Sequence, residues 1–472
     1  MSIVVHAGDI DTNRNAGVIE NVTNVALQTR RFAFAFPGSG VQHPRMGRAL
    51  YETNSAFRVA FDECRSILAV LGGFDIAAAL FSARDNTAFA DAIKSPGKSG
   101  VCIFSYQYAM TRTLAEIGIF PSVVFGHSLG EYSAAVAAGA LSLHDGLTLV
   151  HHRGLLLDSL KGNGAMVIAA AAVEMVRPML ISGTHIVAVN GPYSTGIAGT
   201  TEQIDLLCTH FESAGCSFHR IRFGSASHCD LVNPIIPGFE KVLQTLNPMP
   251  STCDWYSTHK NELLPAGFLP DVSYWVGQLK NPVFFAQAVS SIHDSDEQCI
   301  FLEIGPQNGL SGLISSTAPN AHVIPLSGHA NDDRGAHTVL AHAINSIKAI
   351  IVGDEGELAD LPTEDEQLTD LEFVVLQVWM EALRSRSIRS TDNFFEIGGH
   401  SMLAARVASD LSEMFGIPLP TNLMAKSSTA FALASALMEH CINANVDANV
   451  VAKTWRMAYE QTEDQLEEAV RA

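Results

Sequence analysis

Residues 121–139, PSVVFGHSLGEYSAAVAAG, constrain the fold of this 472-residue chain more than any other stretch. A short apolar run, Ser122–Phe125, is followed by Gly-His-Ser-Leu-Gly at 126–130 and then by a segment rich in alanine. This order predicts a buried β-strand, a sharp turn permitted by the two glycines, and a helix. In such a G-x-S-x-G turn the hydroxyl of Ser128 lies at a helix N-terminus, where unpaired backbone N–H groups, including that of Leu129, can stabilise an oxyanion. Ser128 is therefore a candidate nucleophile.

The alternation of strand and helix extends over residues 31–350. Short β-type runs such as Phe32–Phe36 and Cys299–Glu303 are separated by longer segments with helical periodicity. This pattern predicts an α/β fold with a mainly parallel sheet. Within it, residues 162–226 read as alternating strands and helices, beginning with a strand at Ala165–Ala169. That order resembles a small ferredoxin-like insert.

The composition changes after residue 350. Residues 351–366 are acidic and poor in aromatic side chains, which is typical of a solvated linker. Residues 367–442 carry two apolar helix faces and predict a small domain of four-helix size. Residues 1–30 are polar and lack helical periodicity, so they are interpreted as an N-terminal extension. The tail, residues 443–472, is either an amphipathic docking helix or a frayed end.

Composition argues against several classes of protein. Lys and Arg number 29 against 49 Asp and Glu, and the resulting net charge of −20 would repel a nucleic-acid backbone. No apolar run reaches the length of a membrane span, and the N-terminus lacks the basic start of a signal peptide. The eight cysteines are scattered, as expected for reduced thiols in a cytoplasmic protein. Metal-ligand spacings and complete nucleotide-binding glycine motifs are missing, so we expect neither a metal nor a nucleotide cofactor.

A nucleophilic serine needs a base, and the residues alone do not select one of the 18 histidines. His228 follows the strand that closes the insert, where the chain returns to the main sheet, but an arbitrary histidine is more often a packing or surface residue. Arg153 lies on an apparent helix 25 residues after Ser128. It is either a surface arginine paired with a carboxylate of the protein or a bidentate clamp for a carboxylate of the substrate.

Several motifs together resemble the acyltransferase family that includes malonyl-CoA:acyl-carrier-protein transacylases and polyketide synthase acyltransferase domains. In the order of that family, they are F-P-G-x-G-x-Q at 36–42 with M-G at 46–47, G-H-S-x-G-E at 126–131, Y-W at 274–275, N-P-V at 281–283 and L-E-I-G-P at 302–306. The resemblance covers residues 32–350. It implies a hydrolase-like, mainly parallel α/β core with a small ferredoxin-like subdomain.

The resemblance also implies the chemistry of the site. Ser128 would be the acyl-accepting nucleophile and His228 its general base. The backbone N–H groups of Ser39 and Leu129 would form the oxyanion hole.

Further residues take roles by the same resemblance. Arg153 would pair with the free carboxylate of a malonyl-type group, and Asn190 would line the site. A backbone carbonyl near Gln307 or Asn308 would orient the histidine, in place of the aspartate of a triad.

The sequence departs from the family pattern at three places. Ser39 and Gly100 stand where glutamine is usual; the first change leaves the backbone N–H intact, and the second removes one side-chain contact. Residues 225–228, Ser-Ala-Ser-His, match neither the H-A-F-H typical of malonyl selectivity nor the full Y-A-S-H typical of methylmalonyl selectivity. Ser225 and Ser227 are therefore candidate substrate-binding residues, and Ser227 leaves room that a phenylalanine would fill. Such a pocket separates one methylene by only about 1–3 kcal/mol, so the acyl group stays open.

Residues 392–401, DNFFEIGGHS, resemble the D-x-F-F-x-x-G-G-x-S signature of phosphopantetheine-binding carrier domains. Aromatic residues anchor a loop, two glycines permit a turn, and Ser401 comes just before a helix whose N-terminus favours an incoming phosphate. A local role of Ser401 as helix cap is compatible with this interpretation. The resemblance implies 4′-phosphopantetheine on Ser401, a phosphopantetheinyl transferase as partner, and closer kinship to peptidyl carriers than to acyl carriers.

These features predict an enzyme that moves a malonyl-type group from acyl-CoA, through an ester on Ser128, to the phosphopantetheine thiol of a carrier. We expect this carrier to be the chain's own, with phosphopantetheine on Ser401. It would supply extender units to polyketide or hybrid polyketide/peptide synthase modules. Three alternatives stay open. In the first, the donor is another acyl carrier and not CoA. In the second, the G-x-S-x-G turn belongs to a thioesterase or hydrolase. In the third, the acyltransferase portion is inert and the chain is a carrier and interaction protein.

Overall fold

The structure of the chain is a computed structural model. It describes residues 30–81, 95–160, 162, 164–221, 226–327, 336–352, 369–383, 388, 394, 401–420, 423–427, 429–444, 446–457 and 459. The predicted N-terminal extension up to residue 29, the predicted linker from residue 353 onward and Ser225 lie outside the described residues.

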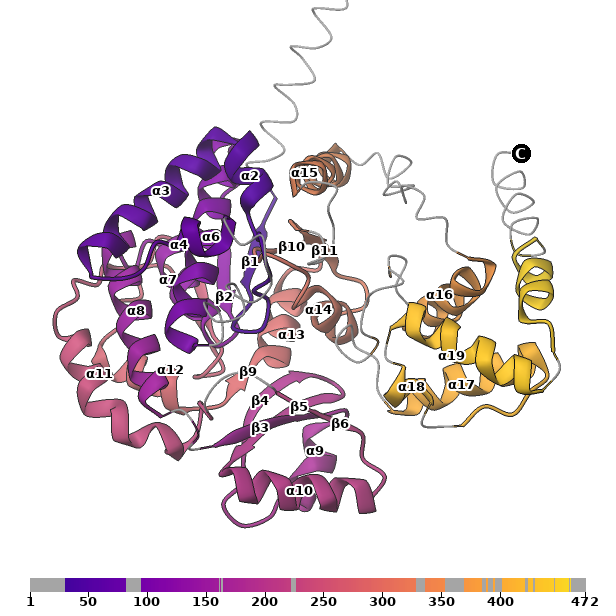
Figure 1. Ribbon diagram of the computed structural model, residues 1–472. Coiled ribbons are helices and arrows are strands. Elements are labelled where there is room, and N and C mark those ends of the chain that lie inside the picture. Colours follow the sequence, from indigo (N-terminus) through magenta and orange to yellow (C-terminus); the bar gives the residue numbers. More distant parts are fainter. Residues whose placement is uncertain are drawn as a thin grey trace, which may run out of the picture.

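Six strands form the main sheet, in the order β11-β10-β1-β2-β7-β8 (Figure 1). They are β1 (Phe32–Phe36), β2 (Val123–Gly126), β7 (Asp254–Ser257), β8 (Glu262–Leu264), β10 (Ile300–Glu303) and β11 (His322–Pro325). The first five strands of that order pair in parallel, whereas β8 is the antiparallel hairpin partner of β7. Phe36 pairs with Gly126, so the carboxyl ends of β1 and β2 meet at one edge of the sheet. The predicted α/β core with a mainly parallel sheet is confirmed.

The helices around this sheet are α2 (Arg48–Thr53), α3 (Ser55–Val70), α4 (Ile76–Phe81), α6 (Pro96–Glu116), α7 (Gly130–Ala137), α8 (Leu143–Ser159), α11 (Ile236–Leu243), α12 (Val272–Lys280), α13 (Phe285–Ser295), α14 (Ser311–Thr317) and α15 (Ala336–Val352). Alternating side chains of β1 point to opposite faces, because the side-chain period of a strand is two. Phe34 and Phe36 pack with α3, α6, α7 and α8, whereas Ala33 and Ala35 pack with α13 and α14. The two groups of helices lie on opposite sides of the sheet (Figure 1). Both faces of the sheet are therefore buried, which explains its continuous apolar strands.

A second sheet has the order β6-β3-β5-β4-β9. Its strands are β3 (Ala165–Ala169), β4 (His185–Gly191), β5 (Ser194–Gly199), β6 (Phe218–Arg220) and β9 (Val283–Phe284). The helices α9 (Val173–Val176) and α10 (Thr201–Ser213) share one hydrophobic core with β3 and β5. The first four strands and these two helices have the predicted ferredoxin-like order. The two-residue strand β9 was not predicted; it follows α12 in the chain and pairs in parallel with β4.

The C-terminal region is helical, as predicted. It contains α16 (Asp370–Leu383), α17 (Ser401–Phe415), α18 (Leu423–Lys426) and α19 (Ala430–Asn443), with Trp379, Val407 and Leu437 in its core. Residues 448–457 form a further helix, and its Ala448 and Ala452 are buried in the same core. This part of the tail is therefore packed rather than frayed, and the core extends beyond residue 442.

The described residues have three properties that concern membranes, metals and disulfides. None of their helices has the length and apolar character needed to cross a membrane. No three of their His, Cys, Asp or Glu side chains are grouped so that they could hold a metal ion. All eight cysteines are free thiols.

Candidate active site

Ser128 lies in the turn between β2 and α7. Its φ of 51° falls in the left-handed region, which is strained for a residue that has a Cβ. The turn is held by two approaches that only glycine permits. A Cβ on Gly126 would lie 2.1 Å from the backbone nitrogen of Glu131, and a Cβ on Gly130 would lie 1.9 Å from the carbonyl oxygen of Phe36. The structure thus places Ser128 in the strand–turn–helix geometry that the sequence pattern predicts.

His228 is brought to this serine from 100 residues further along the chain. Its Nε2 lies 2.7 Å from Ser128 Oγ, and its Nδ1 lies 3.0 Å from the carbonyl oxygen of Asn281. A carbonyl can only accept, so Nδ1 carries the proton and Nε2 is free to accept the hydroxyl proton of the serine. The pair has the geometry of a nucleophile and its base.

The imidazole of His228 is kept neutral by its surroundings. Burial lowers its pKa to about 3, and the electrostatic interactions with Arg153 and then with His127 act in the same direction. The hydrogen bond to Asn281 opposes these effects without reversing them. A neutral imidazole at neutral pH is the form that a general base requires.

The carbonyl that orients His228 belongs to Asn281, and the expectation of one near Gln307 or Asn308 is wrong. Asn281 ends α12 with extended backbone, φ −87° and ψ 157°, as suits a residue that precedes a proline. Its carbonyl is thereby released from the helix and available to the imidazole. Gln307 instead contacts the carbonyl of Gly40, with Nε2 at 3.4 Å.

The two backbone N–H groups expected to form an oxyanion hole border the same turn. Neither Ser39 nor Leu129 donates its N–H to an acceptor in the described part of the chain. The loop that carries Ser39 packs closely against the turn that carries Ser128. A Cβ on Gly38 would lie only 2.6 Å from the carbonyl oxygen of His127. Gln107 fixes this loop by donating to the carbonyl before Gly38, at 2.7 Å. Both donors are therefore free to bind a developing negative charge.

Arg153, on α8, is a buried cation beside the dyad that Ser128 and His228 form. Its exposed fraction is only 4%, and its guanidinium carbon lies 5.3 Å from the centre of the Tyr132 ring. Among the described residues its Nε has no hydrogen-bond partner. The alternative of a surface arginine paired with a protein carboxylate does not fit this burial. A buried guanidinium with an open donor favours an anionic ligand.

Asn190 connects the small sheet to the turn that carries Ser128. It lies in β4, is 7% exposed, and its Oδ1 is 2.7 Å from His127 Nε2. Because His127 directly precedes the serine, this hydrogen bond fixes the small subdomain against the nucleophile. The predicted position of Asn190 beside the site agrees with the geometry.

The sequence departures fall at or near the dyad. Ser227 is half-buried and directly precedes His228. Ser225 lies outside the described residues. Gly100 is inside α6, and a Cβ there would lie 3.6 Å from Leu129, an ordinary contact distance. The glycine therefore leaves a small space next to one of the candidate oxyanion donors.

Comparison with known proteins identifies the region that contains this site. Residues 33–346, more than half of the chain, match the acyl transferase domain family. The chain belongs to this family. Residues 374–437 match a second family, described as a phosphopantetheine attachment site. The chain therefore combines an acyltransferase domain with a phosphopantetheine carrier domain.

The most similar relatives include large polyketide synthases. The chain is 31% identical over 361 residues to the phenolphthiocerol synthesis polyketide synthase type I Pks15/1 of Mycobacterium marinum, and this match covers 72% of the chain and 16% of the relative. It is 30% identical over 332 residues to mycoketide-CoA synthase of Mycobacterium tuberculosis, covering 68% of the chain and 8% of that protein. The chain thus spans only a small part of the length of these relatives.

Solved structures agree with the family. The acyltransferase domain of SpnD, solved in complex with 2-(pent-4-yn-1-yl)malonyl, is 30% identical with a TM-score of 0.63, and the match covers 68% of this chain and 77% of that one. The acyltransferase domain of the second salinomycin polyketide synthase module is 29% identical with a TM-score of 0.61, covering 71% and 80%. The malonyl CoA-acyl carrier protein transacylase of Clostridium perfringens, 21% identical over 69% and 99% with a TM-score of 0.60, shares the fold.

In the carrier domain, Ser401 is the first residue of α17. Phe394 of the carrier signature is buried against Trp379, with ring centres 4.9 Å apart, as an anchor of the preceding loop should be. Residues 395–400 lie outside the described residues. The N-terminus of a 15-residue helix is a suitable place for a phosphodiester, because the unpaired N–H groups and the helix dipole favour the phosphate.

Gln278 and Tyr132 are buried polar side chains near Ser128 that were not singled out from the sequence, whereas Glu131 appeared there only as the last residue of the G-H-S-x-G-E motif. Gln278 Nε2 donates to the carbonyl of Ser128 at 2.7 Å, and Tyr132 Oη donates to Gln278 Oε1 at 2.6 Å. Glu131 accepts from Tyr274 Oη at 2.6 Å. Their proximity in the chain to the G-x-S-x-G and Y-W motifs was the available signal, but pairing between residues 143 to 150 positions apart is visible only in the fold.

Proposed function

We propose that this chain is an acyltransferase that moves a malonyl-type group from CoA, through an ester on Ser128, to the phosphopantetheine thiol of a carrier domain, including its own. The observation that carries the proposal is the 2.7 Å hydrogen bond between Ser128 Oγ and His228 Nε2. The buried cation of Arg153 beside this pair adds selectivity for an acyl group that bears an acid.

In the first transfer, Ser128 loses its proton to His228 Nε2 as Oγ attacks the thioester carbonyl of acyl-CoA. The N–H groups of Ser39 and Leu129 stabilise the oxyanion that forms. When the carbon–sulfur bond breaks, His228 returns the proton to the departing CoA thiolate. The products are free CoA and an acyl ester on Ser128, and the site has regained neutral His228.

The second transfer uses the same groups in the opposite sense. When bound at Ser401, 4′-phosphopantetheine supplies a thiol on a flexible arm, which is the acyl acceptor. His228 accepts the proton of the acceptor thiol and gives it to Ser128 Oγ as the ester breaks. Because this thiol is attached to the same chain as Ser128, its effective concentration at the site is raised.

Arg153 accounts for the class of acyl group. A malonyl-type substrate carries a free carboxylate, and a guanidinium can bind it with two parallel hydrogen bonds. The open Nε and the low exposure of Arg153 support this role. Asn190 borders the site, and Ser225 and Ser227 are proposed to face the α-substituent of the acyl group.

The setting is an assembly line in the cytoplasm. A phosphopantetheinyl transferase would modify Ser401, and polyketide or hybrid polyketide/peptide synthase modules would receive the acyl group. The relatives, which are polyketide synthases and include a PKS-NRPS hybrid synthetase of Aspergillus niger, support this setting.

Intact mass spectrometry of the full chain carrying phosphopantetheine tests the proposal. The protein is exposed in turn to malonyl-, methylmalonyl- and acetyl-CoA. We expect one acyl mass on the carrier from a malonyl-type donor. In Ser401→Ala the mass should appear on Ser128, and Ser128→Ala should acquire none.

The outcomes separate the alternatives. Loading of Ser128→Ala at the wild-type rate would overturn the catalytic assignment. Steady hydrolysis of acyl-CoA by Ser401→Ala, without a stable ester, would favour a thioesterase. Loading only from a separate acyl carrier would replace CoA as donor. A loading rate that does not change on dilution indicates transfer within one chain.

A further inference from the structure

The last turn of α12 contacts both members of the dyad. The N–H of His228 donates to the carbonyl of Leu279 at 3.1 Å, and its imidazole is oriented by Asn281 at 3.0 Å. From the same turn, Gln278 Nε2 donates to the carbonyl of Ser128 at 2.7 Å. One short stretch of chain, residues 278–281, therefore fixes the nucleophile and the base relative to each other.

The amide of Gln278 has only one orientation that satisfies its neighbours. The carbonyl of Ser128 can only accept, so the amide nitrogen must face it, and the amide oxygen then faces Tyr132 Oη at 2.6 Å. Gln278 is 1% exposed and Tyr132 is fully buried. Because water is excluded, losing either partner leaves a buried polar group unsatisfied.

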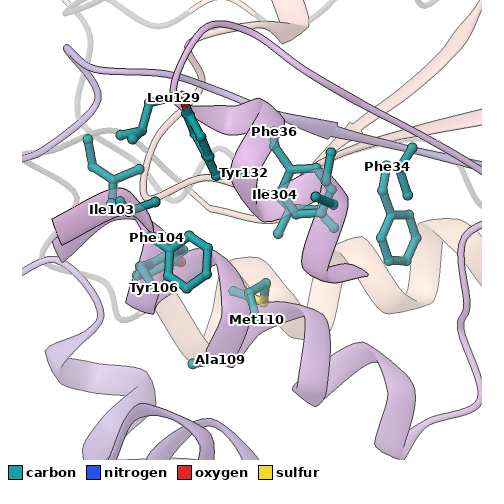
Figure 2. Close-up of a cluster of buried hydrophobic side chains, with 14 of the residues drawn as sticks. Phe34, Phe36, Ile103, Phe104, Tyr106, Ala109, Met110, Leu129, Tyr132 and Ile304 are labelled. Atoms are coloured by element: carbon teal, nitrogen blue, oxygen red, sulfur yellow. The ribbon is translucent and has the colours of Figure 1, made fainter. Parts of the chain in front are cut away.

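The ring of Tyr132 is itself held by two neighbouring side chains. Trp275 stacks on it with ring centres 5.0 Å apart, and the guanidinium of Arg153 lies 5.3 Å from the ring centre. Figure 2 shows Tyr132 near Leu129 in the buried cluster. The hydroxyl that orients Gln278 thus comes from a side chain with little freedom to move.

Ser128 needs such support because its backbone is strained. The left-handed φ of 51° is unfavourable for serine by about 1–3 kcal/mol and persists only where the surroundings impose it. Its carbonyl accepts the amide of Gln278 and, at 3.2 Å, the N–H of Glu131. Rotation of the turn toward an ordinary conformation would break these bonds and carry Oγ away from His228.

We propose that Gln278 is a positioning residue for the nucleophile: its side chain holds the carbonyl of Ser128 so that Oγ stays within hydrogen-bond reach of His228, and Tyr132 fixes the orientation of its amide. Gln278 does not touch the reacting atoms. The proposal deepens the proposed acyltransferase function and rests on it only for the acylation measurement.

The test compares two substitutions of similar size, Gln278→Met and Gln278→Glu, in the Ser401→Ala background, where the acyl group stays on Ser128. Methionine cannot donate, so we expect the acylation rate to fall about 100-fold, while KM for the acyl-CoA changes less than about threefold. A buried glutamic acid keeps its proton at low pH and can then donate to Ser128 and accept from Tyr132. Gln278→Glu should therefore approach the wild-type rate near pH 6 and lose it as the pH rises to 9.

Dividing the acylation rate of the variant by that of the wild type at each pH cancels the effect of groups that titrate in both proteins. The buried titratable and charged groups on the elements around Gln278 include Glu131 and Tyr132 on α7, Arg153 on α8, Tyr274 on α12, His228 before α11 and His259 after β7. A role in packing alone would give the same ratio at every pH.

A second pair of variants keeps the proposal testable if Gln278→Met does not fold. Tyr132→Phe removes the hydroxyl that orients the amide and should slow acylation about 3- to 10-fold. Tyr106→Phe removes a hydroxyl that is equally buried but bonds to Ser327, and should leave the rate unchanged.

Inactivation of Ser128 by a fluorophosphonate provides a readout that needs no acyl donor, and we expect the same order of rates. Wild-type rates for Gln278→Met, or a Gln278→Glu ratio that does not change with pH, would overturn the proposal. If the wild type reacts with the fluorophosphonate but accepts no acyl group from any donor, the proposed function fails while the role of Gln278 is still decided.

Discussion

The two serines on which the proposed transfer depends are placed by different means. Ser128 has a strained backbone, two glycine contacts and a hydrogen bond from Gln278 that hold it against His228. Ser401 is the first residue of a regular helix, α17, in a small helical domain. A nucleophile needs a fixed geometry relative to its base, whereas an attachment site needs a helix N-terminus that accepts a phosphate.

The same contrast applies to the cores beneath them. The main sheet packs its two faces against helices that come from residues 48–352, and the carrier core is built from α16 to α19 with residues 448–457. The clusters share no residue. We therefore expect the two domains to unfold independently, and substitutions in one to leave the other intact.

The largest effect should come from Gly130→Ala, because its Cβ would lie 1.9 Å from the carbonyl oxygen of Phe36. Relief requires α7 to move away from β1, so we expect a loss of about 4 kcal/mol or more in acyltransferase-domain stability, and no acylation. The carrier domain should still accept phosphopantetheine at Ser401.

Gly100→Ala is the matched control for Gly130→Ala. It also adds a methyl group to a buried glycine, but the nearest atoms are 3.5 Å away in Val150 and 3.6 Å away in Leu129. We expect no loss of stability, since alanine favours a helix over glycine. Equal melting temperatures for the two variants would contradict the steric argument.

Arg153→Ala should come next, and its effect should depend on the acyl group. We expect transfer of malonyl groups to fall about 100-fold, because the carboxylate loses its paired cation, while transfer of acetyl groups changes little. Competition between the two CoA thioesters, followed by intact mass, measures the ratio directly. Equal losses for both donors would show that the arginine supports the fold of the site instead of recognising the carboxylate.

The sequence predicted those parts of the acyltransferase domain that depend on local order. The turn at Ser128 and the strand Ala165–Ala169 lie where their patterns placed them, because strand, glycine and helix signals are adjacent in the chain. His228 came from family resemblance alone, since its hydrogen bond to Ser128 joins residues 100 apart. The orienting carbonyl of Asn281 was misplaced, because every residue has a carbonyl and only the end of α12 makes this one available.

In the C-terminal region the limits were different. The apolar faces in residues 367–442 predicted helices correctly, but they did not show that residues 448–457 complete the core. In that segment Ala448 and Ala452 are the buried residues, and alanine carries little hydrophobic signal in a sequence. The contribution of residues 448–457 to the carrier core becomes visible only in the structure, where these two alanines are buried.

A smaller effect, dependent on pH, is expected for Glu131→Gln. Burial raises the pKa of Glu131 to about 7, against the opposing effect of hydrogen bonds from Tyr274 and Thr258. The folded protein therefore keeps a proton that the unfolded chain releases above its ordinary pKa of 4.5, and stability is lost as the pH rises from 4.5 toward 7. Glutamine has no proton to lose, so the variant should gain about 2 kcal/mol relative to wild type at pH 8 and little at pH 4.5.

Urea unfolding of both proteins at several pH values measures this difference. His228 titrates in the opposite sense, because its lowered pKa removes stability as the pH falls below 6.5, but it is common to both proteins and cancels. A difference that does not vary with pH would show that the fold does not raise the pKa of Glu131. The carrier transition should not respond to this substitution.

The smallest effect is expected in the carrier domain, from Arg456→Ala. Arg456 lies in the helix at 448–457, pairs with Asp370 at 3.2 Å, and stands 4.5 Å from the ring centre of Phe373. The side chains of Arg456 and Asp370 are about one third exposed, at 33% and 35%, so solvent screens the pair and the loss should be about 1 kcal/mol. It should lower only the unfolding midpoint of the carrier domain. Arg406→Ala, which removes longer and more exposed ion pairs on α17 at 3.5 and 3.7 Å, is the control and should cost less. If Arg456→Ala instead slowed acylation of Ser128, the two domains would be coupled, and the contrast between a fixed nucleophile and an independently folded attachment domain would fail.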